Sequence, residues 1–368
     1  MEYLKPSQDF HPSLAFTFDE TFDLVAEEVA NLQNNVGLCE VNGFNRFEIT
    51  GEDRHAFLDR MICGRVPKRD GRVGLGYLLN HHGMLKCEAT VANLPGSDRG
   101  PARVWYGSAA ASEFHDMDWL TLHLAEDEDV QIRSLTNDQT ILVLAGPRSR
   151  DVISACARGD WSKEAFPWLS VRGCFIGIAP ATVMAVSFSG ELAYEIHVPN
   201  TSLYAAYLAL REAGAAFGLK RFGARAVDSM RMEKGYLHWK SDILTEFDPF
   251  ETGLDRFVDR EKREFVGKTA LLKRLDDGPR RKFVNLTVDC DHAPAHGGAS
   301  VMQDGQVVGT ITSGDWGHRV GMNLAYAFVD PELSATGQTM QLDLCGELVT
   351  VEVIEPSPYD PDLTRVRQ

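Results

Sequence analysis

The fold of this chain is decided by Asp228-Ser229-Met230-Arg231-Met232-Glu233-Lys234-Gly235-Tyr236, which closes a region, Ser202 to Lys234, where two helical patterns dominate. Two further segments follow it closely, His238-Trp239-Lys240-Ser241-Asp242-Ile243 and Asp248 to Val258. Pro249 and Gly253 punctuate the second segment, which is typical of irregular structure. We therefore expect helices that lead into a long irregular passage.

Upstream of this stretch, helical and strand-like patterns interleave without a strict alternation. Helical spacing covers 22–32, 56–62 and 149–157, and strand-like patterns cover 46–50, 76–79 and 85–91. The last two strands enclose Asn80-His81-His82-Gly83, which indicates a hairpin. The mixture predicts a fold of the α+β class.

The C-terminal part of the chain has a different pattern. A charged segment at 276–282 is followed by short β-type runs at 283–288, 307–311 and 348–353, with turns between them. We therefore predict a first domain of mixed α+β structure at residues 1–280 and a C-terminal domain at residues 281–368 that is a small all-β barrel or sandwich.

Composition and charge exclude several classes of protein. The net charge of −16 argues against nucleic acid as a partner, because that affinity depends on clustered Lys and Arg. No run of about eighteen apolar residues is present, so we expect no membrane partner. The seven cysteines are scattered without a Cys-x-x-Cys pair, and the N-terminus lacks the pattern of a signal peptide. A cytoplasmic location fits these features best.

Three apparent motifs do not meet their chemical requirements. Gly267-Lys268-Thr269 ends like a phosphate-binding loop, but Lys262 stands where that loop needs glycine. The glycines between 71 and 76 have the wrong spacing for a dinucleotide site. Cys290, His292 and His296 lie in an expected loop, and their spacing alone cannot show the second-shell carboxylates of a zinc site, so we predict no metal.

The segments around Arg231 resemble the aminomethyltransferase family, which includes the glycine cleavage T-protein and the folate-binding C-terminal parts of dimethylglycine and sarcosine dehydrogenases. The form Met232-Glu233-Lys234-Gly235-Tyr236 followed by His238-Trp239 is most similar to the dehydrogenase branch. The resemblance continues, in family order, at 187–195, 265–271, 309–314 and 323–327. It implies a ring of three subdomains around a cavity for tetrahydrofolate, the last subdomain being the β-barrel.

The resemblance also implies which residues hold the pterin ring. Glu195 matches the family's pterin-binding glutamate, and a carboxylate can accept two parallel hydrogen bonds from an amino group and a ring N–H. Phe188 stands where relatives often carry tyrosine, so it keeps a flat surface and lacks the hydroxyl. Glu195 could instead be an ordinary exposed strand residue.

Glu88 is the candidate catalytic residue. It occupies the place of the family's reactive carboxylate, usually aspartate, on the strand after the Asn-x-x-Gly hairpin. There a carboxylate can orient the accepting nitrogen, take its proton or stabilise a cationic carbon. Two alternatives remain open: Glu88 is a surface residue, or Lys86 on the same strand face neutralises it.

Four further residues are implied to bind the folate. Arg231 matches one arginine of the family's helix, while Val227 replaces another that contacts folate in the T-protein. Tyr236 and Trp239 are candidates for the cavity wall, and Tyr359 resembles a C-terminal tyrosine that closes the site. Arg231, Tyr236 and Trp239 could equally be structural, because aromatic residues after a helix commonly pack in a core.

The implied activity is a tetrahydrofolate-dependent one-carbon transfer from an N-methylated amine such as dimethylglycine or sarcosine. No flavin-binding motif is present, so oxidation of the amine would need a separate flavoprotein, whereas direct transfer from a sulfonium or quaternary ammonium substrate would need none. The alternatives are a glycine cleavage T-protein and a folate-binding protein without catalysis.

Overall fold

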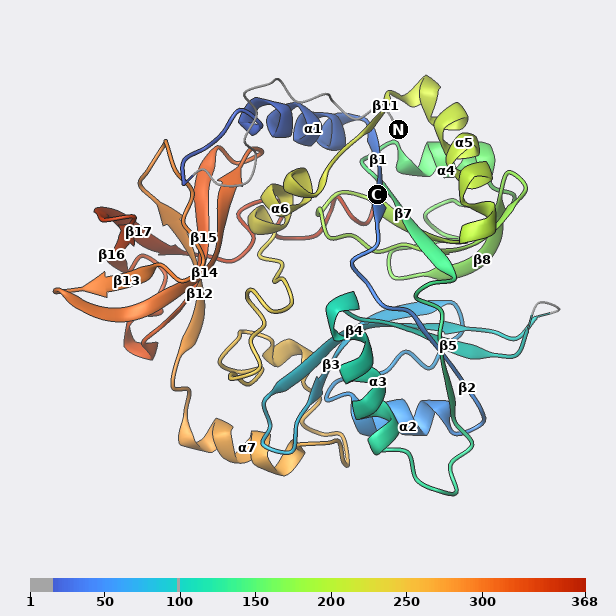
Figure 1. Cartoon of the computed structure of the whole chain (residues 1–368), viewed down its shortest axis with the longest axis horizontal. Coiled ribbons are helices and arrows are strands. Elements are labelled where there is room, and N and C mark those ends of the chain that lie inside the picture. Colours follow the sequence, from blue (N-terminus) through green and yellow to red (C-terminus); the bar gives the residue numbers. More distant parts are fainter. Residues whose placement is uncertain (1–15, 98–99) are drawn as a thin grey trace.

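Three β-sheets lie around a ring in the computed structural model, which describes residues 16–97 and 100–368 (Figure 1). Two of the sheets are open and carry helices, and the third closes into a barrel. The segment that leaves α6 (Ala224–Glu233) runs through the middle of the ring towards β3 and β4 (Figure 1). Segments far apart in the sequence therefore meet at the centre.

The first sheet has six strands and includes the strand that carries Glu195. In spatial order it contains β11 (Leu219–Arg221), β1 (Val36–Val41), β7 (Gln139–Ala145), β10 (Ala193–Pro199), β9 (Ala179–Met184) and β8 (Val171–Ile176). Its helices are α1 (Phe22–Asn34), α4 (Ser149–Cys156), α5 (Leu203–Gly214) and α6. Alternate strand residues such as Leu144, Tyr194 and Ile196 enter one buried apolar cluster, which fixes which face of each strand points inward.

The second sheet has five strands and presents Glu88. Its order is β3 (Arg72–Leu79), β4 (Leu85–Leu94), β5 (Arg103–Gly107), β2 (Phe47–Thr50) and β6 (Gln131–Ser134), with helices α2 (Arg54–Met61) and α3 (Glu113–Leu122). Buried Phe47, Phe57 and Tyr106 belong to its core. The β3–β4 turn contacts α7 (Lys268–Asp277), where a Cβ on Gly83 would come within 2.6 Å of the Leu271 backbone nitrogen.

The barrel closes the ring. Its strands are β12 (Lys282–Val288), β15 (Met322–Val329), β14 (Gln306–Gly317), β13 (Ser300–Gln303), β16 (Thr339–Leu344) and β17 (Glu347–Ile354). Five short 3₁₀ helices connect elements of the described chain: η1 (Ala110–Ser112), η2 (Asn200–Ser202), η3 (Ala215–Phe217), η4 (Asp255–Phe257) and η5 (Pro331–Leu333). Strand closure pairs the backbone groups that open edges would expose.

The α+β class and the C-terminal barrel are confirmed. The expected hairpin lies at β3 and β4, and the helix expected at 56–62 occupies 54–61. The division of the chain at residue 280 stays a prediction, although β12 begins at Lys282. No helix in the described ranges has the length and apolar character needed to cross a membrane.

A buried ionic network joins the barrel to the rest of the ring. Arg319, in the loop between β14 and β15, donates from Nη1 to Glu191 Oε1 at 2.8 Å and also pairs with Glu233 at the end of α6. The side chains of all three residues are at most 1% exposed. Glu191 accepts further hydrogen bonds from Tyr359 and Arg365, both at 2.8 Å. The C-terminal segment is thereby fixed to the same point.

We expect Arg319→Met to destabilise the fold by about 3–5 kcal/mol, because it leaves the buried carboxylate of Glu233 without its cation and leaves Glu191 with Arg365 alone. Urea unfolding followed by circular dichroism measures the change. The matched control is Arg65→Met, since Arg65 is 89% exposed in its pair with Asp259 and should cost less than about 1 kcal/mol. Equal effects of the two substitutions would contradict the importance of this network.

Candidate active site

Glu88 lies beside Tyr77 across the β3–β4 pair. The two residues are direct partners in the antiparallel register, so their side chains share one face of the sheet. The hydroxyl of the buried Tyr77 donates to Glu88 Oε1 at 2.9 Å. The hairpin therefore gives the carboxyl group a fixed hydrogen-bond donor and a defined orientation.

Burial raises the pKa of Glu88 from its ordinary value near 4.5 to about 7. The Tyr77 hydrogen bond opposes this rise because it stabilises the charged form, and the negative charge of Asp242 adds to it. A carboxyl group with a pKa near neutrality can both take and return a proton. Of the alternatives for Glu88, an ordinary surface role is therefore disfavoured.

Asp242 is completely buried and holds three segments together. Its Oδ2 accepts from Arg231 Nη1 and from the backbone N–H of His238, both at 2.8 Å. Its Oδ1 accepts from the hydroxyls of Thr312 and Ser313 on β14, both at 2.6 Å. These bonds fix the segment after α6 against the barrel.

Arg231 is almost fully used by protein partners. Besides Asp242, its guanidinium donates to Asp228 Oδ1 at 3.0 Å, Ser313 Oγ at 3.1 Å and the Tyr236 carbonyl at 3.2 Å. The residue is 5% exposed. This arrangement favours the structural interpretation of Arg231, which acts on the site through Asp242 and the segment that follows α6.

Trp239 belongs to the segment after α6 and shares an apolar cluster with Tyr77, the hydrogen-bond partner of Glu88. It is 8% exposed and lies in one apolar cluster with Tyr77 and Phe250, and its indole N–H donates to Ser112 Oγ at 3.2 Å. Trp239 therefore belongs to the same apolar cluster as β3 and β4 residues such as Tyr77 and Leu85. The hydrophobic contact and the hydrogen bond together define the ring's position.

Phe188 and Tyr236 form an aromatic pair. Their rings are nearly parallel, at 16°, with centroids 6.1 Å apart, and Phe188 keeps 37% of its surface exposed. The buried Lys234 ammonium, bonded to the carbonyls of Tyr359 and Asp360, lies 6.0 Å from the Tyr236 ring. These contacts bring three of the predicted residues, Phe188, Tyr236 and Tyr359, into one neighbourhood.

Tyr359 is held firmly within that neighbourhood. Its hydroxyl donates to Glu191, and the Arg319 guanidinium lies 3.9 Å from its ring centroid. A cation at this distance is attracted by the face of the ring. Tyr359 is therefore a fixed part of the C-terminal segment, and its hydroxyl is already engaged.

Glu195 lies on β10 with its carboxylate 3.4 Å from the buried His197 Nε2. Neither ring nitrogen of His197 has a hydrogen-bond partner among the described residues, although the imidazole packs against Trp105 at a centroid distance of 4.6 Å. Glu195 is 23% exposed and has no arginine or lysine partner in the described ranges. Its oxygen atoms remain available as acceptors.

The positions of Lys86 and of the Cys290–His296 group bear on two points raised by the sequence. Lys86 does not neutralise Glu88, because its Nζ lies 2.6 Å from His115 Nε2 and 4.8 Å from the Trp119 ring centroid. Cys290 and His292 are neighbours, with Sγ and Nδ1 3.4 Å apart, while His296 bonds to the Phe16 carbonyl. No group of three metal-binding side chains occurs within residues 16–97 and 100–368.

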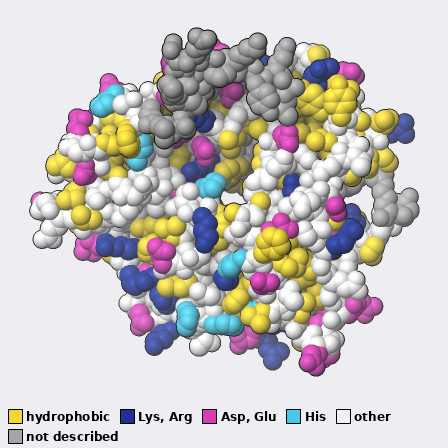
Figure 2. All heavy atoms as spheres, in the orientation of Figure 1, with side chains coloured by type: hydrophobic (Ala, Val, Ile, Leu, Met, Phe, Trp, Pro, Cys, Tyr) yellow, Lys and Arg dark blue, Asp and Glu magenta, His cyan; other side chains and the backbone are white. Residues whose placement is uncertain are grey.

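Sequence reasoning missed Tyr77, Asp242 and the orphaned His197. Tyr77 stands opposite Glu88 in the hairpin, so the register of that hairpin was a usable signal. The role of Asp242 depends on β14, about 70 residues further along the chain, and was visible only as part of a motif. Figure 2 shows that the molecular face is hollowed near the middle of the ring.

Comparisons with known proteins match both parts of the chain. Residues 3–262 match the GCVT N-terminal domain, and residues 281–360 match the glycine cleavage T-protein C-terminal barrel domain. The aminomethyltransferase of Caldanaerobacter subterraneus is 25% identical over 92% of this chain and 88% of its own length. The aminomethyltransferase T structure from Bartonella henselae has a TM-score of 0.81 at 22% identity, covering 92% of this chain and 90% of that one, which is a likeness of fold.

Two mitochondrial dehydrogenases are similar over a part of their length. Dimethylglycine dehydrogenase of Rattus norvegicus is 30% identical over 99% of this chain and 42% of its own length. Sarcosine dehydrogenase of Mus musculus is 30% identical over 96% of this chain and 40% of its own length. The chain thus spans about two fifths of each of these relatives.

We expect Glu88 to lose its proton with a midpoint near pH 7, because burial disfavours the charged carboxylate. Infrared difference spectra between the wild type and Glu88→Gln, recorded from pH 5 to 9, isolate this carboxyl group. Tyr77→Phe should move the midpoint upward, since it removes the bond that stabilises the carboxylate. Tyr106→Phe, which removes another buried hydroxyl, is the control. A midpoint near pH 4.5 would refute the raised pKa of Glu88.

Proposed function

The chain belongs to the aminomethyltransferase (glycine cleavage T-protein) family, as its motifs indicate, and from that premise we propose that it transfers a one-carbon unit from a small N-methylated amine to tetrahydrofolate. The observation that carries the proposal is the Glu88 carboxyl group, which accepts a hydrogen bond from Tyr77 and has a pKa of about 7. This is the property that a proton-transfer residue needs at neutral pH.

The described residues fit a pterin ring. Glu195 offers two carboxylate oxygens without a strong protein partner, beside the unpaired nitrogens of His197. A cyclic amidine-like edge with two N–H donors would satisfy the carboxylate in a bidentate manner. The pair of Phe188 and Tyr236 supplies flat aromatic surface with one partly exposed ring. Tetrahydrofolate, when bound, supplies the ring nitrogen that accepts the carbon.

In this proposal Glu88 acts as an acid–base residue. As the deprotonated carboxylate it takes the proton that the accepting nitrogen loses when the new C–N bond forms. As the protonated acid it returns a proton to the amine nitrogen when the old C–N bond breaks, so that the amine leaves neutral. Tyr77 keeps Oε1 in place through both states, because its hydroxyl can donate to the carboxylate or accept from the acid.

The substrate class follows from the similarity to dehydrogenases of dimethylglycine and sarcosine. Removing a methyl group at the oxidation level of formaldehyde takes two electrons from the amine. This chain matches about two fifths of the length of those dehydrogenases. We infer that a flavoprotein oxidises the amine and passes the product to this chain. Direct transfer from a sulfonium or betaine donor needs no oxidant, because the cationic centre already makes a good leaving group.

A second candidate, transfer from a lipoyl-bound aminomethyl group, is favoured by the similarity to an aminomethyltransferase over most of both chains. Val227 counts against this second candidate. It is partly buried against an apolar cluster that includes Val29 and Met230, whereas the T-protein has a folate-contacting arginine at this position. We further propose a cytoplasmic location, since no disulfide bond joins the described cysteines, as expected in a reducing compartment.

Glu88→Gln should lower turnover by about 10²- to 10⁴-fold while leaving the Kd for tetrahydrofolate within about two-fold, because the amide keeps the shape and cannot exchange the proton. The assay follows folate product from dimethylglycine, sarcosine and a betaine, with and without a flavoprotein oxidase. Full activity of the variant would refute the role of Glu88.

Glu195→Ala should weaken tetrahydrofolate binding by about ten-fold or more, which corresponds to about 1.4 kcal/mol. Isothermal titration calorimetry gives the Kd of each protein. Glu352→Ala, which removes an exposed glutamate from β17 of the barrel, is the matched control and should bind like the wild type. If the wild type does not bind tetrahydrofolate at all, the proposed function is wrong.

A further inference from the structure

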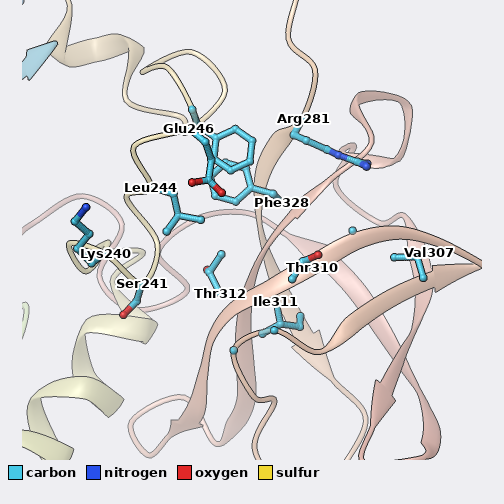
Figure 3. A pocket seen from close by; sticks show the side chains of 14 residues that line it. Lys240, Ser241, Leu244, Glu246, Arg281, Val307, Thr310, Ile311, Thr312 and Phe328 are labelled. Atoms are coloured by element: carbon cyan, nitrogen blue, oxygen red, sulfur yellow. The ribbon is translucent and has the colours of Figure 1, made fainter. Parts of the chain in front are cut away.

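A cavity of about 500 Å³ lies between segment 240–247 and strand β14, in the size range of small-molecule sites. Figure 3 shows Lys240 and Ser241 at one end, Thr312 and Thr310 along the strand, and Arg281 at the other end. The cavity contains neither Glu88 nor Glu195. None of the residues assigned to the folate site lines it.

Lys240 adopts a backbone conformation that its side chain makes unfavourable. Its φ is +68°, in the left-handed region where glycine is the natural choice. The loop imposes this angle, because the N–H of Lys240 bonds to the Ile243 carbonyl and the N–H groups of Asp242 and Ile243 both bond to the His238 carbonyl. The hydrogen bonds of the loop therefore hold Lys240 in this conformation and give its side chain a fixed starting point.

Lys240 is also the one cation of this cavity that has no carboxylate partner in the described parts of the chain. Arg281 is paired with Asp330 and donates to the Val308 carbonyl at 3.0 Å. The exposed Lys240 side chain has only the Trp239 ring near it, 5.5 Å from Nζ. An incoming anion would therefore find an unpaired positive charge at the Lys240 end.

The rest of the lining combines apolar surface with hydroxyl groups. Phe328 stacks on Phe247 with centroids 3.9 Å apart, and Leu244 and Ile311 lie beside this pair. Thr310 and Ser241 supply hydroxyls, while the carboxylate of Glu246 lines the same wall. Glu246 disfavours a second negative group beside it and can accept a hydrogen bond from an amide or ammonium N–H.

We propose that this cavity binds a chain-like organic carboxylate whose terminal carboxyl group pairs with Lys240 and Ser241. Its methylene groups lie over Leu244, Ile311 and Phe328, and an N–H group faces Glu246. A γ-glutamyl chain has this chemistry, either free or as the tail of a folate. A folate tail as the source rests on the proposed function, whereas a free γ-glutamyl chain does not.

The position of the loop gives such a ligand a connection to Glu88. Trp239, which precedes Lys240, packs in one cluster with Tyr77, and Asp242, two residues further, raises the pKa of Glu88 through its charge. Trp239 and Asp242 therefore serve the Glu88 side, while Lys240 and Ser241 serve the cavity. A ligand on Lys240 would restrain the loop that supports both groups.

The test uses Lys240→Gly, because glycine accepts the left-handed backbone and the variant should keep or raise the Tm. Calorimetry with γ-glutamylglutamate should give binding to the wild type that weakens by about ten-fold or more in the variant. Lys163→Gly, at another exposed lysine, is the control for charge and should not change binding. Lys240→Met separates the loss of charge from the loss of the stem.

A second arm identifies the source of the carboxylate. Tetrahydrofolate with three glutamyl residues should bind more tightly than the monoglutamate form, and Lys240→Gly should remove that difference if the ligand is the folate tail. Equal binding of the two folates, with Lys240-dependent binding of γ-glutamylglutamate, assigns the cavity to a free carboxylate. No binding of γ-glutamylglutamate to the wild type at about 10 mM, or unchanged binding to Lys240→Gly, overturns the proposal.

Discussion

The buried carboxylate of Asp242 is the interaction on which the centre of this ring depends. Each of its oxygens accepts two hydrogen bonds, and the donors come from α6, from the segment after it and from barrel strand β14. A buried charge is tolerated only when such partners replace water. Removing one donor would therefore leave the desolvation of the carboxylate less well compensated. The packing of all three segments would be destabilised.

The same charge explains why Glu88 differs from an ordinary strand glutamate. Asp242 satisfies its own charge locally, yet its negative potential still disfavours a second carboxylate nearby and adds to the effect of burial on the pKa of Glu88. Tyr77 acts in the opposite direction. The proton affinity of Glu88 is thus a balance between structural residues, and it depends on how firmly the segment after α6 is held against the barrel.

The sequence predicted the fold well where the signal is local. The β3–β4 hairpin, the helices around Arg231 and the β-rich C-terminal part follow from periodicity and turn residues, which depend on neighbours along the chain. The family motifs added Glu88 and Glu195, whose roles remain predictions. The role of Arg231 was ambiguous in the sequence, because its guanidinium donates to groups as far along the chain as Ser313. No spacing rule predicts contacts between residues so far apart in sequence.

Lys240 shows what the sequence alone could not reveal. Within His238-Trp239-Lys240-Ser241-Asp242 it is an ordinary lysine between an aromatic residue and a serine, and its left-handed backbone appears only when the loop closes on the His238 carbonyl. Two neighbours in this loop have buried partners, Ser112 for Trp239 and Arg231 for Asp242. Since the loop geometry is fixed from both sides, the residue between them cannot relax without disturbing a support of Glu88, and its strain persists in the native state.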